Sequence, residues 1–89
     1  MESAVYSVAI TQVNGVQINI VLVNYDSISM NDVAARSMLA LKPYFPVGEL
    51  ALAAADIAGV PQFVGPRHLV DYFKGYTLQQ FAWQSVVIG

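Results

Sequence analysis

The single histidine is the residue of this sequence best suited to acid–base chemistry or metal binding. His68 lies three residues before Asp71, so a helix through both would place their side chains on one side. Such a pair can transfer protons or contribute two ligands to a metal site. Nothing else clusters with the pair in the sequence. We therefore expect a surface histidine beside an acidic neighbour, with no metal ion or cofactor, and keep a small-ligand site around His68 as a less favoured alternative.

Other catalytic signatures are missing from the sequence. None of the serines lies in a Gly-x-Ser-x-Gly nucleophile elbow, and the acidic residues are scattered as surface charges usually are. The absence of cysteine excludes thiolate nucleophiles, disulfides and zinc–sulfur sites. No glycine-rich segment is followed by the Lys-Ser/Thr pair of a phosphate-binding loop. The sequence therefore predicts a protein that is not an enzyme.

The sequence combines a high proportion of apolar residues with a low proportion of charged residues. Hydrophobic residues make up 56% of the 89-residue chain and charged residues 11%, whereas a typical soluble domain has about 25% charged residues. A domain of this size cannot easily hide so many apolar side chains. Large exposed apolar patches most often mark surfaces for partners or for self-association. We therefore expect a protein partner, with a homodimer as the leading form.

Three aromatic residues are candidates for such a contact surface. Aromatic side chains are enriched in binding hot spots, and Tyr and Trp keep a polar group that suits the edge of an interface. The other aromatic residues are expected mainly in the core. The candidates for partner binding are Tyr44, Tyr72 and Trp83.

The charge distribution argues against nucleic-acid binding. The net charge is −2 and the basic residues are scattered, whereas nucleic-acid affinity rests on clustered Lys and Arg. Residues 55–60, Ala-Asp-Ile-Ala-Gly-Val, are similar to the first helix and turn of helix-turn-helix DNA-binding proteins. That resemblance implies a recognition helix directly afterwards, but Pro61 and Gly65-Pro66 interrupt it and Arg67 is its only basic residue. Nucleic acid is not an expected partner, and DNA binding is kept as an alternative.

The hydrophobic runs are too short to span a membrane. A spanning helix needs about 20 mainly apolar residues. The two best candidates, residues 47–60 and 16–23, are shorter and are interrupted by polar side chains. The N-terminus has neither the basic flank nor the apolar core of a secretory signal. We therefore expect a soluble, cytoplasmic protein that does not bind membranes.

The elements that position these side chains are clearest in the N-terminal third, where two β-rich segments flank Asn14-Gly15 and predict a hairpin. A two-residue turn pairs Val13 with Val16, whereas a three-residue loop pairs Gln12 with Val16. A slip of one residue moves every side chain to the other face of the sheet. Only the three-residue loop gathers the apolar residues near the turn on one face, so the sequence favours a bulged hairpin.

Residues 47–60 are open to two interpretations. Ala and Leu dominate, and Gly59 followed by Pro61 would end a helix. A strand over residues 49–55 is the alternative, although Ala is depleted in strands. We favour the helix, with a very short strand over residues 62–64.

The C-terminal segment is also ambiguous. Thr77 and Gln80 have the spacing of a helix capping box, whereas residues 81–87 alternate as in a strand. A hairpin alone is marginal in water and needs a third strand, so we favour a strand over residues 78–87.

The sequence thus predicts a single small α+β domain. An N-terminal β-hairpin, two to three short helices and a C-terminal strand would form a mainly antiparallel sheet packed on helices. The expected elements are strands over 4–12 and 16–24, helices from about 29 to 42, over 47–60 and over 66–74, and a strand over 78–87.

The expected function is a non-enzymatic protein–protein interaction module that self-associates. It would act as a small inhibitor or adaptor that docks onto a larger protein, a type common among phage and mobile-element products by analogy only. The leading alternative is a structural or assembly subunit, because it would share the surplus of apolar residues.

Overall fold

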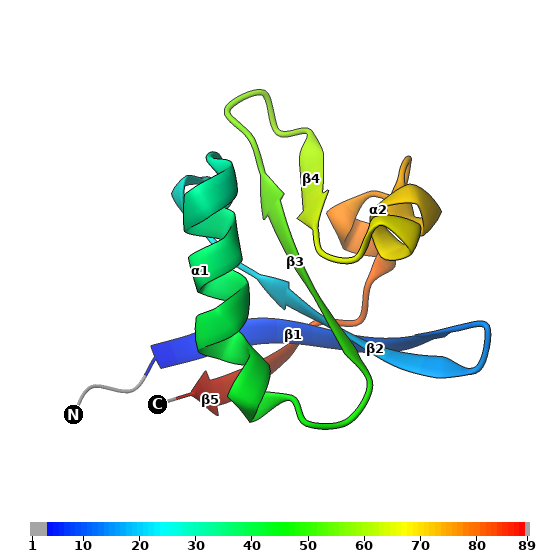
Figure 1. The fold of residues 1–89 in the computed structure, drawn as a ribbon. Coiled ribbons are helices and arrows are strands. Elements are labelled where there is room, and N and C mark those ends of the chain that lie inside the picture. Colours follow the sequence, from blue (N-terminus) through cyan, green and yellow to red (C-terminus); the bar gives the residue numbers. More distant parts are fainter. Residues whose placement is uncertain (1–3, 89) are drawn as a thin grey trace.

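The computed structural model describes residues 4–88, which form a five-stranded sheet with one helix against each face (Figure 1). The strand order is β4-β3-β2-β1-β5; β2 and β3 are parallel and every other neighbouring pair is antiparallel. The expected α+β class, with its N-terminal hairpin and C-terminal strand, is confirmed. The strands are β1 (Ala4–Val13), β2 (Val16–Leu22), β3 (Glu49–Ala55), β4 (Pro61–Val64) and β5 (Gln84–Ile88), and the helices are α1 (Asn31–Leu41) and α2 (Arg67–Phe73).

Each face of the sheet has its own hydrophobic core. The core on the α1 side includes the buried residues Val8, Val21, Leu50, Leu52, Ala34 and Leu41. The core on the α2 side includes Ala9, Ile20, Ala51, Ala53, Leu69 and Phe73. Because successive side chains of a strand point to opposite faces, the central strands contribute apolar residues in both directions.

Burial on both faces explains why the favoured hairpin register is wrong. Val13 pairs with Val16, so β1 and β2 are joined by the two-residue turn Asn14-Gly15. Both turn residues have positive φ angles, 53° and 80°, as a type I′ hairpin turn requires. Apolar side chains gather on one face of a hairpin when the other face of the sheet is exposed to solvent. In the middle of this hairpin, Val8 and Val21 are buried on one face, and Ala9 and Ile20 are buried on the other. Sorting therefore gives no advantage there, and the turn chemistry of Asn-Gly decides the register.

The helix expected over residues 47–60 is also wrong. This segment forms β3 and the turn that leads to β4, so the alternative prediction of a strand over residues 49–55 is confirmed. A strand buried on both faces has a continuous apolar sequence, which periodicity cannot distinguish from a buried helix. The helix-turn-helix resemblance fails at the same place, because residues 55–60 are the end of a strand and a tight turn.

The turn between β3 and β4 is organised by one carboxylate. Asp56 Oδ1 accepts a hydrogen bond from the Val60 backbone N–H at 2.9 Å, and Oδ2 accepts one from Gln62 Nε2 at 3.1 Å. Gly59 has a positive φ angle of 81° within this turn, so it serves a hairpin and not the end of a helix. The short strand expected at residues 62–64 is confirmed as part of β4.

The two remaining helices match their predictions closely. α1 begins at Asn31 and ends at Leu41, two residues after the expected start and one residue before the expected end, and Met30 is its N-cap. α2 covers residues 67–73 and starts directly after Pro66. Among residues 4–88, no helix is long and apolar enough to cross a bilayer.

The C-terminal strand is shorter than expected. β5 begins at Gln84, and Leu78–Gln80 form a single turn of 3-10 helix before it. The Thr77 backbone N–H donates to Gln80 Oε1 at 2.7 Å, so the spacing that suggested a helix does organise a short helical turn. Both interpretations of this segment were therefore partly right.

A buried amide side chain and a glycine fix the position of β3 beside β2, after the connection that runs through α1. Asn19 is buried, and its Nδ2 donates to the backbone oxygens of Val47 at 2.8 Å and Glu49 at 3.3 Å. Gly48 lies so close to the Gln17 backbone that a Cβ at this position would collide with the Gln17 carbonyl. These contacts fix where the loop ends and where the parallel pairing begins.

Candidate functional site

His68 pairs with Glu49, not with Asp71. The Nε2 atom of His68 lies 2.9 Å from Oε2 of Glu49, which stands at the start of β3. Asp71 faces Arg67 instead, with 4.0 Å between Oδ2 and Nε. The His68–Asp71 pair, which belonged to the less favoured alternative, does not form, because the tertiary fold brings a carboxylate from a distant strand closer to His68 than its neighbour on the helix.

The histidine–glutamate pair is exposed and lacks further polar partners of the kind that a metal needs. The side chains of His68 and Glu49 keep 61% and 35% of their accessible surface. Within residues 4–88, no group of three or more His, Cys, Asp or Glu side chains could hold a metal ion. The pair joins α2 to the sheet, and this bridging contact is the role that its geometry supports.

The three aromatic residues assigned to partner binding do not form one surface. Tyr44 lies in the turn after α1 and is 52% exposed. Tyr72 lies on α2 and is 46% exposed, whereas Trp83 is half-buried just before β5. The Trp83 indole N–H donates to the Leu78 carbonyl at 2.8 Å, which ties the C-terminal connection together. Trp83 thus has a structural contact that the sequence did not reveal.

An aromatic cluster covers the α2 side of the sheet. Phe73 of α2 lies at its centre, with ring centroids 5.7 Å from Phe63, 5.3 Å from Tyr76 and 5.4 Å from Phe81. Tyr72 and Trp83 extend the cluster at its two ends. Edge-to-face and tilted arrangements of this kind stabilise aromatic pairs beyond their buried area. Most of the aromatic residues therefore serve the core, as the sequence predicted.

The free edge of β5 carries an exposed apolar pair that the sequence analysis did not single out. Val87 of β5 is paired with Val5 of β1, and they are 67% and 68% exposed. Directly opposite residues of antiparallel strands share one face of the sheet. The two valines therefore form a single patch beside an unpaired strand, and only the pairing of the two chain ends reveals it.

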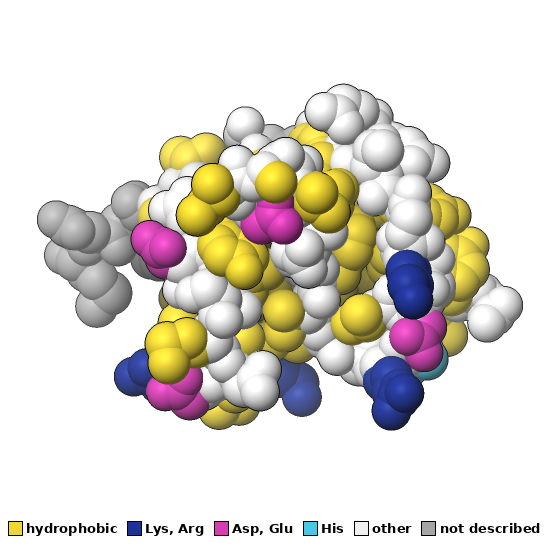
Figure 2. Space-filling model, turned by 90° about the horizontal axis from the view of Figure 1, so that it is seen from above, with side chains coloured by type: hydrophobic (Ala, Val, Ile, Leu, Met, Phe, Trp, Pro, Cys, Tyr) yellow, Lys and Arg dark blue, Asp and Glu magenta, His cyan; other side chains and the backbone are white. Residues whose placement is uncertain are grey.

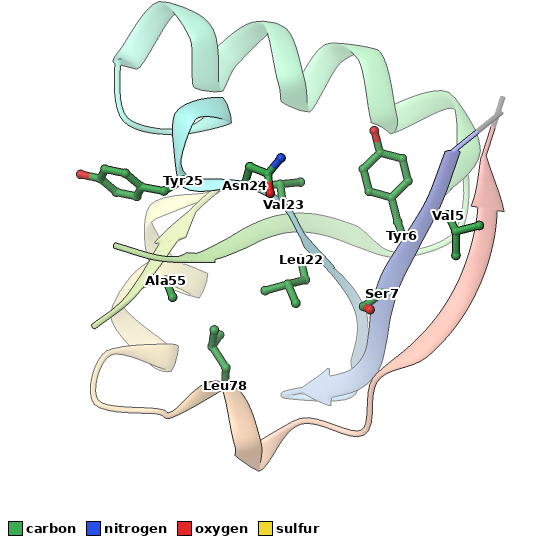
Figure 3. A pocket seen from close by; sticks show the side chains of 9 residues that line it. All are labelled: Val5, Tyr6, Ser7, Leu22, Val23, Asn24, Tyr25, Ala55 and Leu78. Carbon is green, nitrogen blue, oxygen red and sulfur yellow. The ribbon is translucent and has the colours of Figure 1, made fainter. Parts of the chain in front are cut away.

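A pocket of about 480 Å³ opens on the sheet near this edge (Figure 3). The side chains of Leu22, Ala55 and Leu78 surround the opening, with Ser7 at one side, whereas Tyr6 and Val23 point towards α1. The pocket lies where the parallel strands β2 and β3 end. Its lining has no ionisable side chain except the phenols of two tyrosines.

The turn between β3 and β4 exposes further apolar side chains. Ile57 is fully exposed at its tip and Val60 is 51% exposed beside it. Figure 2 shows hydrophobic side chains over this end of the molecule, with an acidic side chain among them and other charged side chains towards the margins. The charges on the two helices include the pairs Arg36–Asp32 and Arg67–Asp71. Basic side chains thus remain dispersed in the folded chain.

No protein-family model, no curated protein and no solved structure matches this chain.

Proposed function

We propose that this domain is a non-enzymatic protein-interaction module that self-associates into a homodimer through the free edge of β5. The observation that carries the proposal is the exposed pair Val5 and Val87 beside an unpaired edge strand. A second copy of the chain is the proposed occupant of this edge. An inhibitor or adaptor role towards a larger protein would then use the surfaces that the dimer leaves open.

The two edges of the sheet differ in how well they are protected. Natural proteins guard edge strands with Lys, Pro, bulges or very short strands. β4 has four residues and begins with Pro61. β5, Gln-Ser-Val-Val-Ile, has neither a charge nor a proline. The β5 edge is therefore the one along which a whole strand of a second copy can pair, whereas β4 allows only a short pairing at Phe63.

A two-fold dimer suits this strand because antiparallel pairing is self-complementary. Two β5 strands related by a two-fold axis would continue the sheet from one copy into the other. The uncharged sequence of β5 brings no like charges together in that arrangement. Val87 would lie near its counterpart across the axis, and the apolar patch formed by Val5 and Val87 would lose part of its contact with water.

The substitution Val87→Lys tests this interface. Val87 is 67% exposed, so the change should leave the fold intact, and the two-fold axis would place two added ammonium groups near one dimer interface. We expect light scattering after size-exclusion chromatography to give a dimer mass for the wild-type chain and a monomer mass for the variant. Replacing Trp83 is a poorer test, because its indole hydrogen bond supports the fold.

Leu39→Lys provides the matched control, because Leu39 is 71% exposed on α1 and does not belong to the sheet or to its β5 edge. This variant should keep the dimer mass. A monomeric wild-type chain at high concentration would show that the homodimer proposal is wrong. A Val87→Lys variant that remains dimeric would place the interface elsewhere, and masses that grow with concentration would favour an assembly subunit.

A further inference from the structure

A groove of about 400 Å³ runs between β4 and α2, at the sheet edge opposite β5. Val60 and Phe63 line it from the strand side, and Val70, Asp71 and Lys74 line it from the helix and its end. The volume lies within the range of about 300–1,000 Å³ that is typical of ligand pockets. The groove therefore combines a strand edge with an apolar wall supplied by a helix.

The backbone of β4 faces this groove with unpaired groups. The Asp56 backbone N–H donates to the Val60 carbonyl at 3.0 Å, so these residues form a hydrogen-bonded pair. Hydrogen-bonded and non-bonded pairs alternate along an antiparallel ladder, and Ala53 pairs with Phe63 in a non-bonded position. The N–H and C=O groups of Phe63 consequently point away from β3. Pro61 occupies the other outward position, where its missing N–H costs no ladder bond.

The side chains around the groove give it a defined chemical character. Val60 is 51% exposed, and Phe63 and Val70 are half-buried, so the wall is apolar and accessible. Among residues 4–88, Lys74 forms no ion pair, whereas the charge of Asp71 is partly offset by Arg67. The groove thus offers one unpaired cation beside an apolar wall and a strand edge.

We propose that this groove binds an extended peptide segment of a partner protein, which adds to β4 as a sixth strand. Backbone groups of the peptide pair with the outward N–H and C=O of Phe63, as in strand addition to other sheet edges. An aliphatic side chain of the peptide contacts Phe63 and Val70, and a carboxylate of the peptide lies near Lys74. This proposal names a partner for the proposed interaction module, but it does not depend on the β5 dimer.

The test selects short random peptides on the wild-type protein by phage display and measures synthetic copies by fluorescence anisotropy. We expect the selected peptides to carry aliphatic residues and an acidic residue, and to shift the NMR signal of the Phe63 amide. Val70→Lys places a charged side chain in the apolar wall of the groove and should weaken peptide binding at least about tenfold. Lys74→Gln removes only a surface charge and should weaken it about two- to fivefold.

Leu39→Lys again serves as the control, because it makes an apolar-to-lysine change on the opposite helix, and its affinity should equal that of the wild type. Thermal melts confirm that each variant is folded. Unchanged binding by Val70→Lys, amide shifts confined to β5, or the selection of no peptide would each overturn the proposal. Unchanged affinity in the Val87→Lys variant would support the groove whether or not the wild-type chain dimerises.

Discussion

Gly48 and Asn19 show how single residues determine the parallel part of this sheet. Asn19 is the one buried polar side chain in the described residues, and it anchors the loop that leads into β3. Gly48 has a φ angle of 84° and touches the Gln17 backbone, so it is restricted both by its conformation and by space. Neither role is visible in the sequence, because each depends on contact between β2 and a loop that follows α1.

Gly48→Ala should therefore be strongly destabilising. The left-handed conformation and the collision with the Gln17 carbonyl act together, and we expect a loss of about 2–4 kcal/mol in the free energy of unfolding. Chemical denaturation monitored by circular dichroism measures the change. Gly59→Ala is the control, because Gly59 has a similar φ angle of 81° but open space around it. It should lose only about 1 kcal/mol. Equal losses would contradict the steric role of Gly48.

The partner of His68 is a second single-residue feature that the sequence does not predict. Its sequence neighbour Asp71 suggested a pair, but Glu49, nineteen positions away, is the contact that forms. Because the pair is largely exposed, solvent screening keeps its contribution to stability small. The sequence correctly identified a surface histidine near an acid, and only the packing of α2 against β3 decided which acid it was.

Among the secondary-structure elements, β3 departs furthest from its sequence-based prediction. β3 is Glu-Leu-Ala-Leu-Ala-Ala-Ala, which has the composition of a helix. It becomes a strand because it lies between β2 and β4 with α1 on one face and α2 on the other. Small alanines suit that position, since helices pack closely on both faces. Tertiary context here outweighs intrinsic propensity.

The stability of the hairpin formed by β3 and β4 should decrease at acid pH because of the turn between these strands. The Val60 backbone N–H, supported by Gln62, holds the pKa of the Asp56 carboxyl below its ordinary value, and slight burial opposes this only in part. A carboxyl whose pKa is lower in the folded state contributes stability above its unfolded pKa. That contribution is lost as the pH falls through the lowered value. Thermal unfolding between neutral pH and about pH 2.5 measures it.

Asp56→Asn isolates this effect, because the amide keeps one acceptor oxygen but has no charge to lose. The variant should be less stable than the wild type at neutral pH, and the difference should shrink in acid. A difference that stays constant across the pH range would mean that the Asp56 charge does not stabilise the turn.

At the scale of the whole molecule, the surplus of apolar residues is only partly absorbed by two cores. Large apolar side chains remain exposed at the β5 edge, at the tip of the β3–β4 turn and on α1. The proposed dimer edge and the proposed peptide groove lie on opposite edges of the same sheet. One chain could therefore bind a second copy at β5 and a peptide partner at β4 at the same time, because the two interfaces do not overlap.

Dimerisation through β5 predicts that thermal stability depends on protein concentration. Mass action stabilises a folded dimer as concentration rises, and we expect the melting temperature to increase by about 3–6 °C for each tenfold step. The monomeric Val87→Lys variant should show no such dependence. Differential scanning fluorimetry over two decades of concentration makes the comparison. A melting temperature of the wild type that stays constant would speak against a stable dimer.

The features that depend on local chemistry are the ones that the sequence alone predicts. Asn-Gly predicts the hairpin, residues 66–74 predict the helix that forms as α2, and the absence of cysteine excludes thiolate chemistry. The order of hydrophobic and polar residues also sufficed for the α+β class.

Three features follow from the tertiary structure alone. They are the burial of both faces of the hairpin, which leaves its register to the Asn-Gly turn, the strand character of β3 and the partner of His68. All three depend on whether one or both faces of the sheet are buried and on contacts between distant segments. A local pattern cannot report these contacts, because the free energy that selects them comes from burial after the chain has folded.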